Sequence, residues 1–418
     1  MIICDNSFEE KIYIPKAIRK FPHKKLNKKK SIKFSHKILL IFSLIFILLI
    51  IHINTNEYIN LNSNIALKYI RKAQQIVFEK IIEKKFKKEN HVNLNEIESK
   101  LLFGRKFEIL KSYRNEINVG LSLDKDYIFK TMITAASVMD SQKLTTRLRL
   151  HFSVVKEFKP KDMIIIYSLR ERIREDVEFN FYNASRVERE LSSITYKGPG
   201  LTAKLLLPQL VLDDVKRLII IDSGDLLVLR DLSQMYNWNM NNNIYMGSPD
   251  FSAGVFGKIS NKTLDIYINA GNYLIDVKKV KEKDMYNLFL KYKNVYGPPF
   301  AEQLMINDIA NGEIGYLPME FGLVPPFSND DFFLNKKEKA LYTYYNLKII
   351  SNNSNFLPKT YEDFLHVAYN PVIVHSWNGK WSDGNGMNIY RKLCQYYIGL
   401  TGIKDEICGK FPGYCKKI

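Results

Sequence analysis

The chain is poor in cysteine and lacks the short signatures of the common cofactor chemistries. Its 418 residues include only 4 cysteines, which excludes a small fold held together by disulfides. It contains no G-x-G-x-x-G fingerprint after a strand, no Walker A lysine motif, no H-E-x-x-H and no G-x-S-x-G. The usual patterns of dinucleotide binding, P-loop nucleotide binding, zinc proteolysis and serine hydrolysis are therefore absent. With 46% hydrophobic residues, the chain is also not disordered throughout.

Acidic residues are outnumbered, and the position of the excess positive charge is informative. The formal net charge is +18, of which +8 falls in residues 1–37, +5 in 54–116 and +5 in 117–418. A nucleic-acid-binding protein gathers its basic residues on a folded module. Here most of the excess lies outside the part that looks globular, which argues against nucleic-acid binding.

One long apolar run is present, at residues 38–53. Its 16 residues are apolar except for Ser43 and His52, and as a helix they span ~24 Å. A buried core helix or a cleaved signal peptide are the alternatives, but the run is apolar on every face and no small residues follow it. We expect an uncleaved transmembrane anchor. The lysines before it place residues 1–37 in the cytoplasm as a basic tail and the remainder in the lumen or outside, as in a single-pass type II protein.

Residues 54–116 mix lysine and glutamate with apolar residues near helical spacing, which predicts a helical stem. Cys4 is expected to stay reduced in the cytoplasm. Cys408 and Cys415 bracket a loop with glycine and proline and could close a disulfide, which leaves Cys394 unassigned. N-glycosylation sequons, a weak indication of a lumenal location, begin at Asn183, Asn261 and Asn352.

From residue 117 onward, predicted strands alternate with predicted helices. Strands are expected at 117–124, 147–155, 161–169, 215–222, 267–277 and 371–375, and helices at 127–142, 200–210 and 298–310. The alternation predicts an α/β domain with a mostly parallel sheet flanked by helices. We assign this catalytic domain to residues 117–395 and a C-terminal tail to 396–418.

Carboxylates follow two of the predicted strands. Asp124 and Asp222 lie at strand ends, where open α/β sheets bind ligands, so we expect them to face one crevice. Asp222 and Asp225 form a D-S-G-D sequence between two apolar runs, where carboxylates are costly unless paired or metal-bound. A hard divalent cation that bridges them to a phosphate would suit them. A simple turn with aspartate capping explains the same residues equally well.

Other polar residues stand at the ends or starts of predicted elements. Asn269 precedes small residues in a strand, Glu302 and Gln303 begin a helix, and His375 ends a strand ahead of Lys380. Small residues let a ligand approach the backbone, imidazole can bind a metal, and a lysine can offset phosphate charge. The alternatives are a strand-edge polar residue, a glutamate that complements the helix dipole and a structural histidine.

Taken in order, six motifs resemble those of glycosyltransferase family 8, a retaining group with the Rossmann-like GT-A fold. They are LSLDKDY, LTAKLLLPQL, IIIDSGDLLVLRDLSQMY, INAGNYLIDV, EQLMIN and VHSWNGKW, and the resemblance covers about residues 117–385. It implies metal binding by Asp222, Asp225 and His375; donor binding by Asp124, Tyr127, Lys204, Gly271, Gly379 and Lys380; and orientation of the donor sugar at the catalytic centre by Asn269, Glu302 and Gln303. The sequence departs from the family pattern in D-S-G-D, which is one residue longer than D-x-D, and in Glu302, which replaces an aspartate.

The resemblance implies transfer of a sugar, with retention, from a nucleotide diphosphate donor to a glycan or glycoprotein acceptor. A UDP-sugar is the expected donor, Mn²⁺ or a similar divalent cation the expected cofactor, and the Golgi or endoplasmic reticulum membrane the expected location. Two alternatives remain at this point. One is a catalytically degenerate, membrane-tethered protein that binds sugar or a partner, which the altered D-S-G-D favours; the other is a nucleotide-sugar hydrolase.

Overall fold

The computed structural model describes residues 75–101, 113–155, 158–194, 199–250, 267–295, 301–322, 370–375 and 388–415, with a few residues between 360 and 367. The chain divides into two compact units, Met1–Ala73 and Gln74–Ile418, and every described residue belongs to the second. Across the described ranges, no helix has the length and apolar character needed to cross a bilayer. The run at 38–53 lies outside them, so the membrane anchor stays a prediction.

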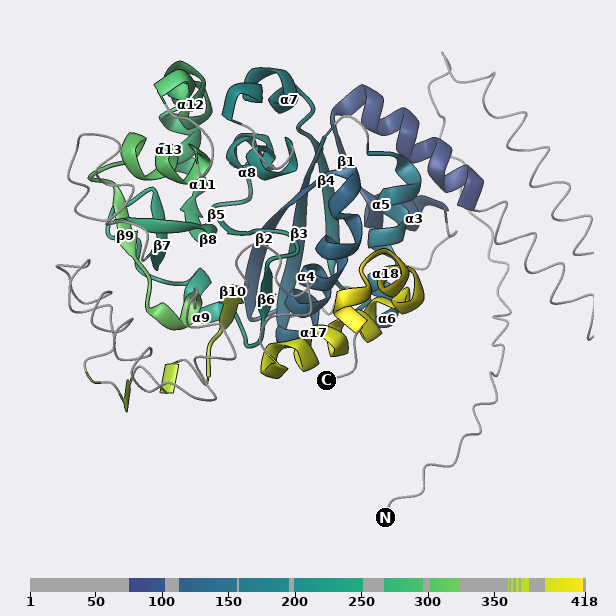
Figure 1. The fold of residues 1–418 in the computed structure, drawn as a ribbon. Coiled ribbons are helices and arrows are strands. Elements are labelled where there is room, and N and C mark those ends of the chain that lie inside the picture. The colour runs from purple at the N-terminus through teal and green to yellow at the C-terminus, as the bar shows by residue number, and fades with distance from the viewer. Residues whose placement is uncertain are drawn as a thin grey trace, which may run out of the picture. The chain divides into compact units, whose positions relative to one another are not determined.

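An eight-stranded mixed sheet forms the centre of the second unit (Figure 1). Its spatial order is β1-β4-β3-β2-β5-β8-β7-β9. The strands are β1 (His91–Asn93), β2 (Asn115–Leu123), β3 (Thr146–Val154), β4 (Glu178–Asn183), β5 (Arg217–Ile221), β7 (Tyr245–Pro249), β8 (Ile268–Asp276) and β9 (Ile314–Tyr316). The pairs β4–β3, β3–β2, β2–β5 and β7–β9 are parallel, whereas β1–β4, β5–β8 and β8–β7 are antiparallel. The prediction of a mostly parallel α/β sheet is therefore confirmed.

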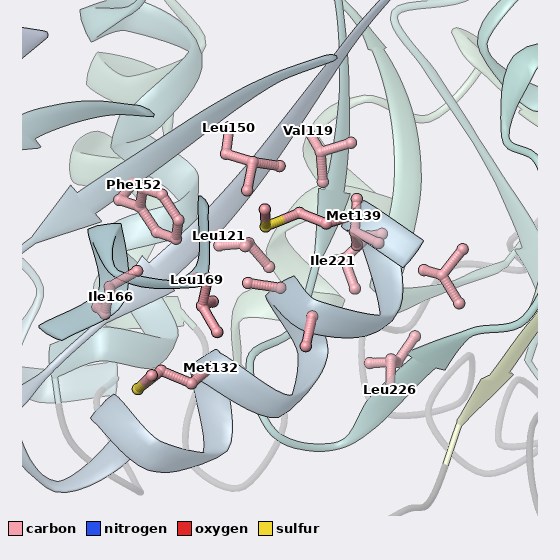
Figure 2. Packing of buried hydrophobic residues seen from close by; sticks show 14 of the residues in the cluster. Val119, Leu121, Met132, Met139, Leu150, Phe152, Ile166, Leu169, Ile221 and Leu226 are labelled. Carbon is pink, nitrogen blue, oxygen red and sulfur yellow. The ribbon is translucent and has the colours of Figure 1, made fainter. Parts of the chain in front are cut away.

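Helices cover both faces of the sheet, which explains why the central strands read as continuous apolar runs. Ile219 and Ile221 of β5 join one hydrophobic cluster, and Leu218 and Ile220 join the other. The first cluster includes α4 (Ile128–Ser141), whose packing on β2, β3 and β5 is shown in Figure 2, and α17 (Asn388–Thr401). The second includes α8 (Pro199–Leu210), α11 (Val277–Glu282), α12 (Met285–Tyr292) and α13 (Ala301–Ile309).

A second, two-stranded antiparallel sheet lies beside the first cluster. It pairs β6 (Leu226–Val228), which follows the D-S-G-D sequence, with β10 (Ile373–His375). Thr134 and Ser137 of α4 bind β6 directly: the Thr134 hydroxyl donates to Leu226 O over 2.9 Å, and Val228 N donates to Ser137 Oγ over 3.0 Å. Helix α4 therefore fixes the position of β6, and through it the position of β10.

The strand prediction for residues 161–169 was wrong, because this segment forms α5 (Pro160–Tyr167). Pro160 occupies the first helical position, which suits its fixed φ. The Asp162 carboxylate accepts a hydrogen bond from Lys159 N over 2.9 Å and so caps the helix. A short apolar run bounded by proline does not distinguish a strand from a helix, and here the capping residues decide.

Part of the segment assigned to the stem belongs to the folded unit. Residues 75–89 are helical, β1 adds an antiparallel strand to β4, and α3 (Leu94–Leu101) follows it. Val92 and Leu94 are fully buried, and the Asn95 side chain bonds both Val177 O and Phe179 N. The edge strand β1 could not be recognised in the sequence because it is three residues long and lies in a lysine-rich region.

The C-terminal residues also pack on the unit instead of forming a separate tail. Helix α17 lies against α4, and α18 (Lys404–Lys410) and the short helix η6 (Pro412–Cys415) lie against α17. Cys408 and Cys415 form a disulfide, the pairing that the sequence left open. Cys394 is buried in the same region.

Candidate functional site

The site lies where β2 and β5 end. The two strands are parallel neighbours, with Gly120 beside Ile220, so Asp124 and Asp222 emerge at the same edge of the sheet. This is the arrangement expected from the sequence, and it is the edge at which α/β sheets bind ligands.

Asp124 is held by backbone N–H groups. Its Oδ1 accepts from Asp126 N over 3.0 Å and from Tyr127 N over 3.1 Å, which caps the short helix η1 (Lys125–Tyr127). Burial raises the pKa of the Asp124 carboxyl, against the lowering effect of these N–H groups and of a third from Gly200. Asp124 is therefore a fixed acceptor whose charge is poorly solvated.

Tyr127 stands next to the aspartates at both strand ends. Its pKa is raised to about 12, mainly by burial and then by the negative charges of Asp225, Asp124 and Asp222, in that order. The residues predicted for nucleotide binding and those predicted for metal binding are therefore close enough to act electrostatically on one hydroxyl.

The D-S-G-D sequence forms a tight turn, which accommodates the one residue by which it is longer than D-x-D. Gly224 has φ +89°, a conformation that residues with a side chain rarely adopt. Its N–H donates to Thr134 Oγ1 over 2.9 Å, while Asp222 N donates to Gly271 O over 2.7 Å. The turn is therefore anchored on α4 at one end and on β8 at the other, and Asp225 leads directly into β6.

Lys204 forms an ion pair with Asp222 at the site. Its Nζ lies 2.7 Å from Asp222 Oδ1 and 2.7 Å from Ala270 O, and the side chain is 1% exposed. A buried ion pair with both partners hydrogen-bonded is costly to break at either end. Lys204 thus fixes the orientation of Asp222, from the basic helix position that the sequence predicted.

His375 reaches the same place from β10. It pairs with Leu226, the residue after Asp225. A methyl group on Gly271 would lie 2.7 Å from His375 Cε1 and 2.7 Å from Asn269 Oδ1, so glycine is required for both side chains to pack there. His375 and Asp222 accordingly both lie against Gly271 of β8, and Asp225 directly precedes the strand that pairs with β10.

The predicted metal ligands are adjacent without forming a ready-made cation site. Two carboxylates and an imidazole are donors that divalent cations accept, so the residues fit such an ion in kind. Among the described residues, however, no three His, Cys, Asp or Glu side chains are gathered closely enough to hold a metal ion. The assignment of Asp222, Asp225 and His375 as ligands stays a prediction.

Two amides, Asn269 on β8 and Gln303 at the start of α13, are oriented by Asp250. The Asn269 amide donates to Asp250 Oδ2 over 2.6 Å and accepts from Gly271 N over 2.7 Å. The Gln303 amide donates to the same carboxylate oxygen over 3.2 Å and accepts from Ala270 N over 3.0 Å. Because a carboxylate only accepts hydrogen bonds, Asp250 fixes which way round both amides lie.

Asp250 was missed by the sequence analysis, although a signal was present. It directly follows the buried strand β7, as Asp124 follows β2 and Asp222 follows β5. Glu302, next to Gln303 at the start of α13, is buried and, like Asp222, acts electrostatically on Tyr273, whose pKa burial raises well above its usual value. Gly379 and Lys380 lie outside the described residues.

An α/β sheet with parallel central strands, and with carboxylates, a buried lysine and oriented amides at one edge, is typical of a ligand-binding α/β protein. Comparison with known families makes the class specific. The model of glycosyl transferase family 8 matches residues 118–375. The chain belongs to this family and is a glycosyltransferase, an enzyme of sugar transfer.

Solved structures agree on the fold. The galactosyltransferase LgtC, crystallised with donor and acceptor sugar analogues, matches with a TM-score of 0.51 at 16% identity, over 70% of this chain and 100% of that chain. The bifunctional glycosyltransferase WbbM matches with a TM-score of 0.53 at 18% identity, over 71% of this chain and 52% of that chain. No curated protein matches the sequence.

Proposed function

We propose that the protein is a membrane-anchored, retaining glycosyltransferase that moves a sugar from a UDP-sugar to a glycan or glycoprotein. The observation that carries this proposal is the meeting of three groups on one sheet edge: Asp124 with Tyr127, the D-S-G-D turn with Lys204, and the two amides with Asp250. The first group would bind the uridine, the second the diphosphate and the third the donor sugar. Family membership and the family order of these groups along the chain support the assignment.

A divalent cation, with Mn²⁺ as the first choice, completes the diphosphate side in this proposal. Asp222, Asp225 and His375 would hold it, and it would supply positive charge against the leaving diphosphate. Lys204 Nζ, 2.7 Å from Asp222 Oδ1, would hold this carboxylate in place beside the diphosphate. Lys380, by resemblance, would contact the diphosphate as well.

On the sugar side, the protein's contribution is orientation. Both amides are buried and hydrogen-bonded to backbone N–H groups of β8, so Asn269 and Gln303 present fixed polar atoms to a sugar. Glu302 lies beside them. Holding donor and acceptor in reactive geometry is a large part of the rate that such a site can provide. We assign no protein nucleophile, since reaction on one face of the sugar needs none.

The location follows from the predicted anchor. The apolar run at 38–53 and the lysines before it support a single-pass type II protein with its catalytic domain in the lumen of the Golgi or endoplasmic reticulum. The Cys408–Cys415 disulfide is consistent with an oxidising compartment.

Calorimetric titration of the purified full-length protein with UDP, with and without Mn²⁺, tests the donor site. We expect metal-dependent UDP binding that falls at least about tenfold in Asp225→Ala and Asp222→Asn. Asparagine is used at 222 because alanine would leave the buried Lys204 ammonium without its carboxylate. Asp213→Asn, at a fully exposed carboxylate that pairs with Lys281, is the matched control and should bind as the wild type does.

A well-folded wild-type protein that binds no UDP would overturn the donor assignment and favour the tethered binding protein. Once UDP binding is established, a panel of UDP-hexoses and UDP-pentoses identifies the donor. UDP release that never depends on an added acceptor would favour the hydrolase.

A further inference from the structure

The C-terminal segment beyond the family match reaches the candidate donor site. The family model ends at residue 375, whereas α17, α18 and η6 continue to Cys415. Helix α17 lies beside α4, and α18 and η6 pack on α17 (Figure 1). The Tyr397 hydroxyl donates to Val228 O of β6 over 3.2 Å, and Tyr414 is 1% exposed. The segment is therefore built into the same support that holds the D-S-G-D turn.

The loop closed by the Cys408–Cys415 disulfide places Phe411 between two lysines. Lys130 Nζ lies 5.4 Å from the centre of the Phe411 ring, and Lys410 Nζ lies 5.6 Å from it. Both distances are within the range of cation–π attraction. Phe411 also packs edge-on against Tyr414, with ring centres 5.6 Å apart, so its own position is fixed from inside the loop.

Of these two lysines, Lys130 lies over a residue of the donor site. Lys130 Nζ lies 5.0 Å from the centre of the Tyr127 ring, while Lys410 lies over Phe129, 5.5 Å away. The Lys130 stem packs on the D-S-G-D turn, since a methyl group on Gly224 would lie 2.5 Å from Lys130 Cβ. The Lys130 ammonium is thus bounded by two aromatic rings while its stem rests on the turn.

The Lys130 ammonium lies over Tyr127, in a part of the site that contains several carboxylates. Asp225, Asp124 and Asp222 all act electrostatically on Tyr127, so a nucleoside diphosphate entering the site meets several carboxylates. A fixed cation lowers the resulting repulsion and can form a charge-assisted hydrogen bond to a phosphate. A lysine side chain loses rotamer freedom when it is held in place, and here the rings and the turn have already restricted it.

We propose that Lys130 is a binding residue for the diphosphate of the donor and that Phe411, in the disulfide-closed loop, is a positioning residue that holds Lys130 over Tyr127. The inference rests on the proposed function and extends the donor site to a segment that lies outside the matched family region.

UDP and uridine titrations of the full-length protein test this pairing, because the two ligands differ only in the diphosphate. We expect Lys130→Met to weaken UDP binding about tenfold, the loss typical of one charge-assisted contact, and to leave uridine binding within about twofold. Lys410→Met is the matched control, because it removes a lysine from the same ring without touching Tyr127, and it should bind both ligands as the wild type does. Lys130→Arg keeps the cation and should restore most of the UDP affinity.

The role of Phe411 has its own variants. Phe411→Ala should weaken UDP binding several-fold with uridine binding retained, and Phe411→Tyr, which keeps the aromatic face, should restore it. The Cys408→Ser/Cys415→Ser pair opens the loop and should act in the same direction. Melting temperatures of all variants separate these effects from unfolding.

The outcomes separate the two levels of the proposal. Equal UDP affinities for wild type, Lys130→Met and Lys410→Met would overturn this inference and leave the transferase assignment intact. Equal losses of UDP and uridine binding in Lys130→Met would also overturn it, because they would show that Lys130 supports the fold or the ring and not the phosphates. A wild-type protein that binds no UDP would overturn both.

Discussion

Asp250 accepts hydrogen bonds from Asn269 and Gln303 through the same oxygen. The carbonyl oxygen of each amide accepts a hydrogen bond from a backbone N–H of β8. The acceptor-only carboxylate and these N–H donors together hold each amide in one of its two orientations. The polar atoms offered to a sugar therefore depend on the buried Asp250 as well as on the backbone of β8.

Asp250→Asn should separate sugar handling from nucleotide binding. An asparagine can present either its oxygen or its NH₂ group to the two amides, and hydrogen bonds to a charged group contribute about 1.5–3 kcal/mol. We expect turnover of the UDP-sugar donor to fall about 10- to 100-fold, with calorimetric UDP affinity unchanged because Asp124 and Tyr127 are untouched. Tyr267→Phe removes the other acceptor of the Gln303 NH₂ group, at 3.2 Å, and should cost less than tenfold. A loss of UDP affinity equal to the loss of turnover would contradict this division of the site.

At the scale of elements, the turn between β5 and β6 carries the departure from the family pattern. Gly224 combines φ +89° with a Lys130 side chain that leaves no room for a methyl group. In Gly224→Ala the left-handed conformation costs about 1–2 kcal/mol, and overpacking typically adds about 1–3 kcal/mol. Denaturant unfolding should show that combined loss, and UDP affinity should fall with it because Asp222 and Asp225 flank the turn.

Gly312→Ala separates the two contributions. Gly312 has φ +86°, but nothing lies within 4 Å of the added methyl group. This variant should lose only the backbone part of the stability and should bind UDP normally. Equal losses in the two alanine variants would mean that contact with Lys130 does not constrain the turn.

Within the sheet, a buried histidine makes stability depend on pH. His151 Nε2 lies 2.9 Å from Asn118 Oδ1, and Nδ1 lies 3.0 Å from the Tyr182 hydroxyl. Burial lowers the pKa of His151 well below its usual 6.5, so the folded ring stays neutral while the unfolded chain takes up a proton. The contribution of the neutral His151 to the free energy of unfolding is fully present above pH 6.5. It is lost as the pH falls below that value, by about 1.4 kcal/mol per pH unit. Urea unfolding between pH 7.5 and 5.5 should show this slope, which His151→Gln should flatten and which replacement of the exposed His366 by glutamine should leave unchanged.

At the scale of the whole molecule, the sequence predicted the centre of the fold better than its edges. Buried parallel strands such as β5 form unbroken apolar runs. The ends of these runs, and with them Asp124 and Asp222, could therefore be located from the pattern of apolar residues along the chain. Helix α5 could not, because its apolar run is short and only the Pro160 and Asp162 capping distinguishes it from a strand. Asp250 carries the same strand-end signal as Asp124 and Asp222, whereas the position of Phe411 beside Lys130 depends on tertiary pairing that no local pattern encodes.

The N-terminal boundary of the folded unit gives the last prediction. The apolar side chains of Ile82, Val92, Leu94 and Ile97 are buried, and each contributes about 1.5–3 kcal/mol. Together they match much of the 5–15 kcal/mol that separates a typical native state from the unfolded chain. A chain that begins at Gln74 should therefore unfold cooperatively and bind UDP as the full-length protein does, whereas one that begins at Tyr113 should lack β1, leave β4 as an open edge and aggregate. Chemical unfolding and size-exclusion chromatography of the two fragments distinguish these cases, and a stable, monomeric Tyr113 fragment would return residues 75–101 to the stem.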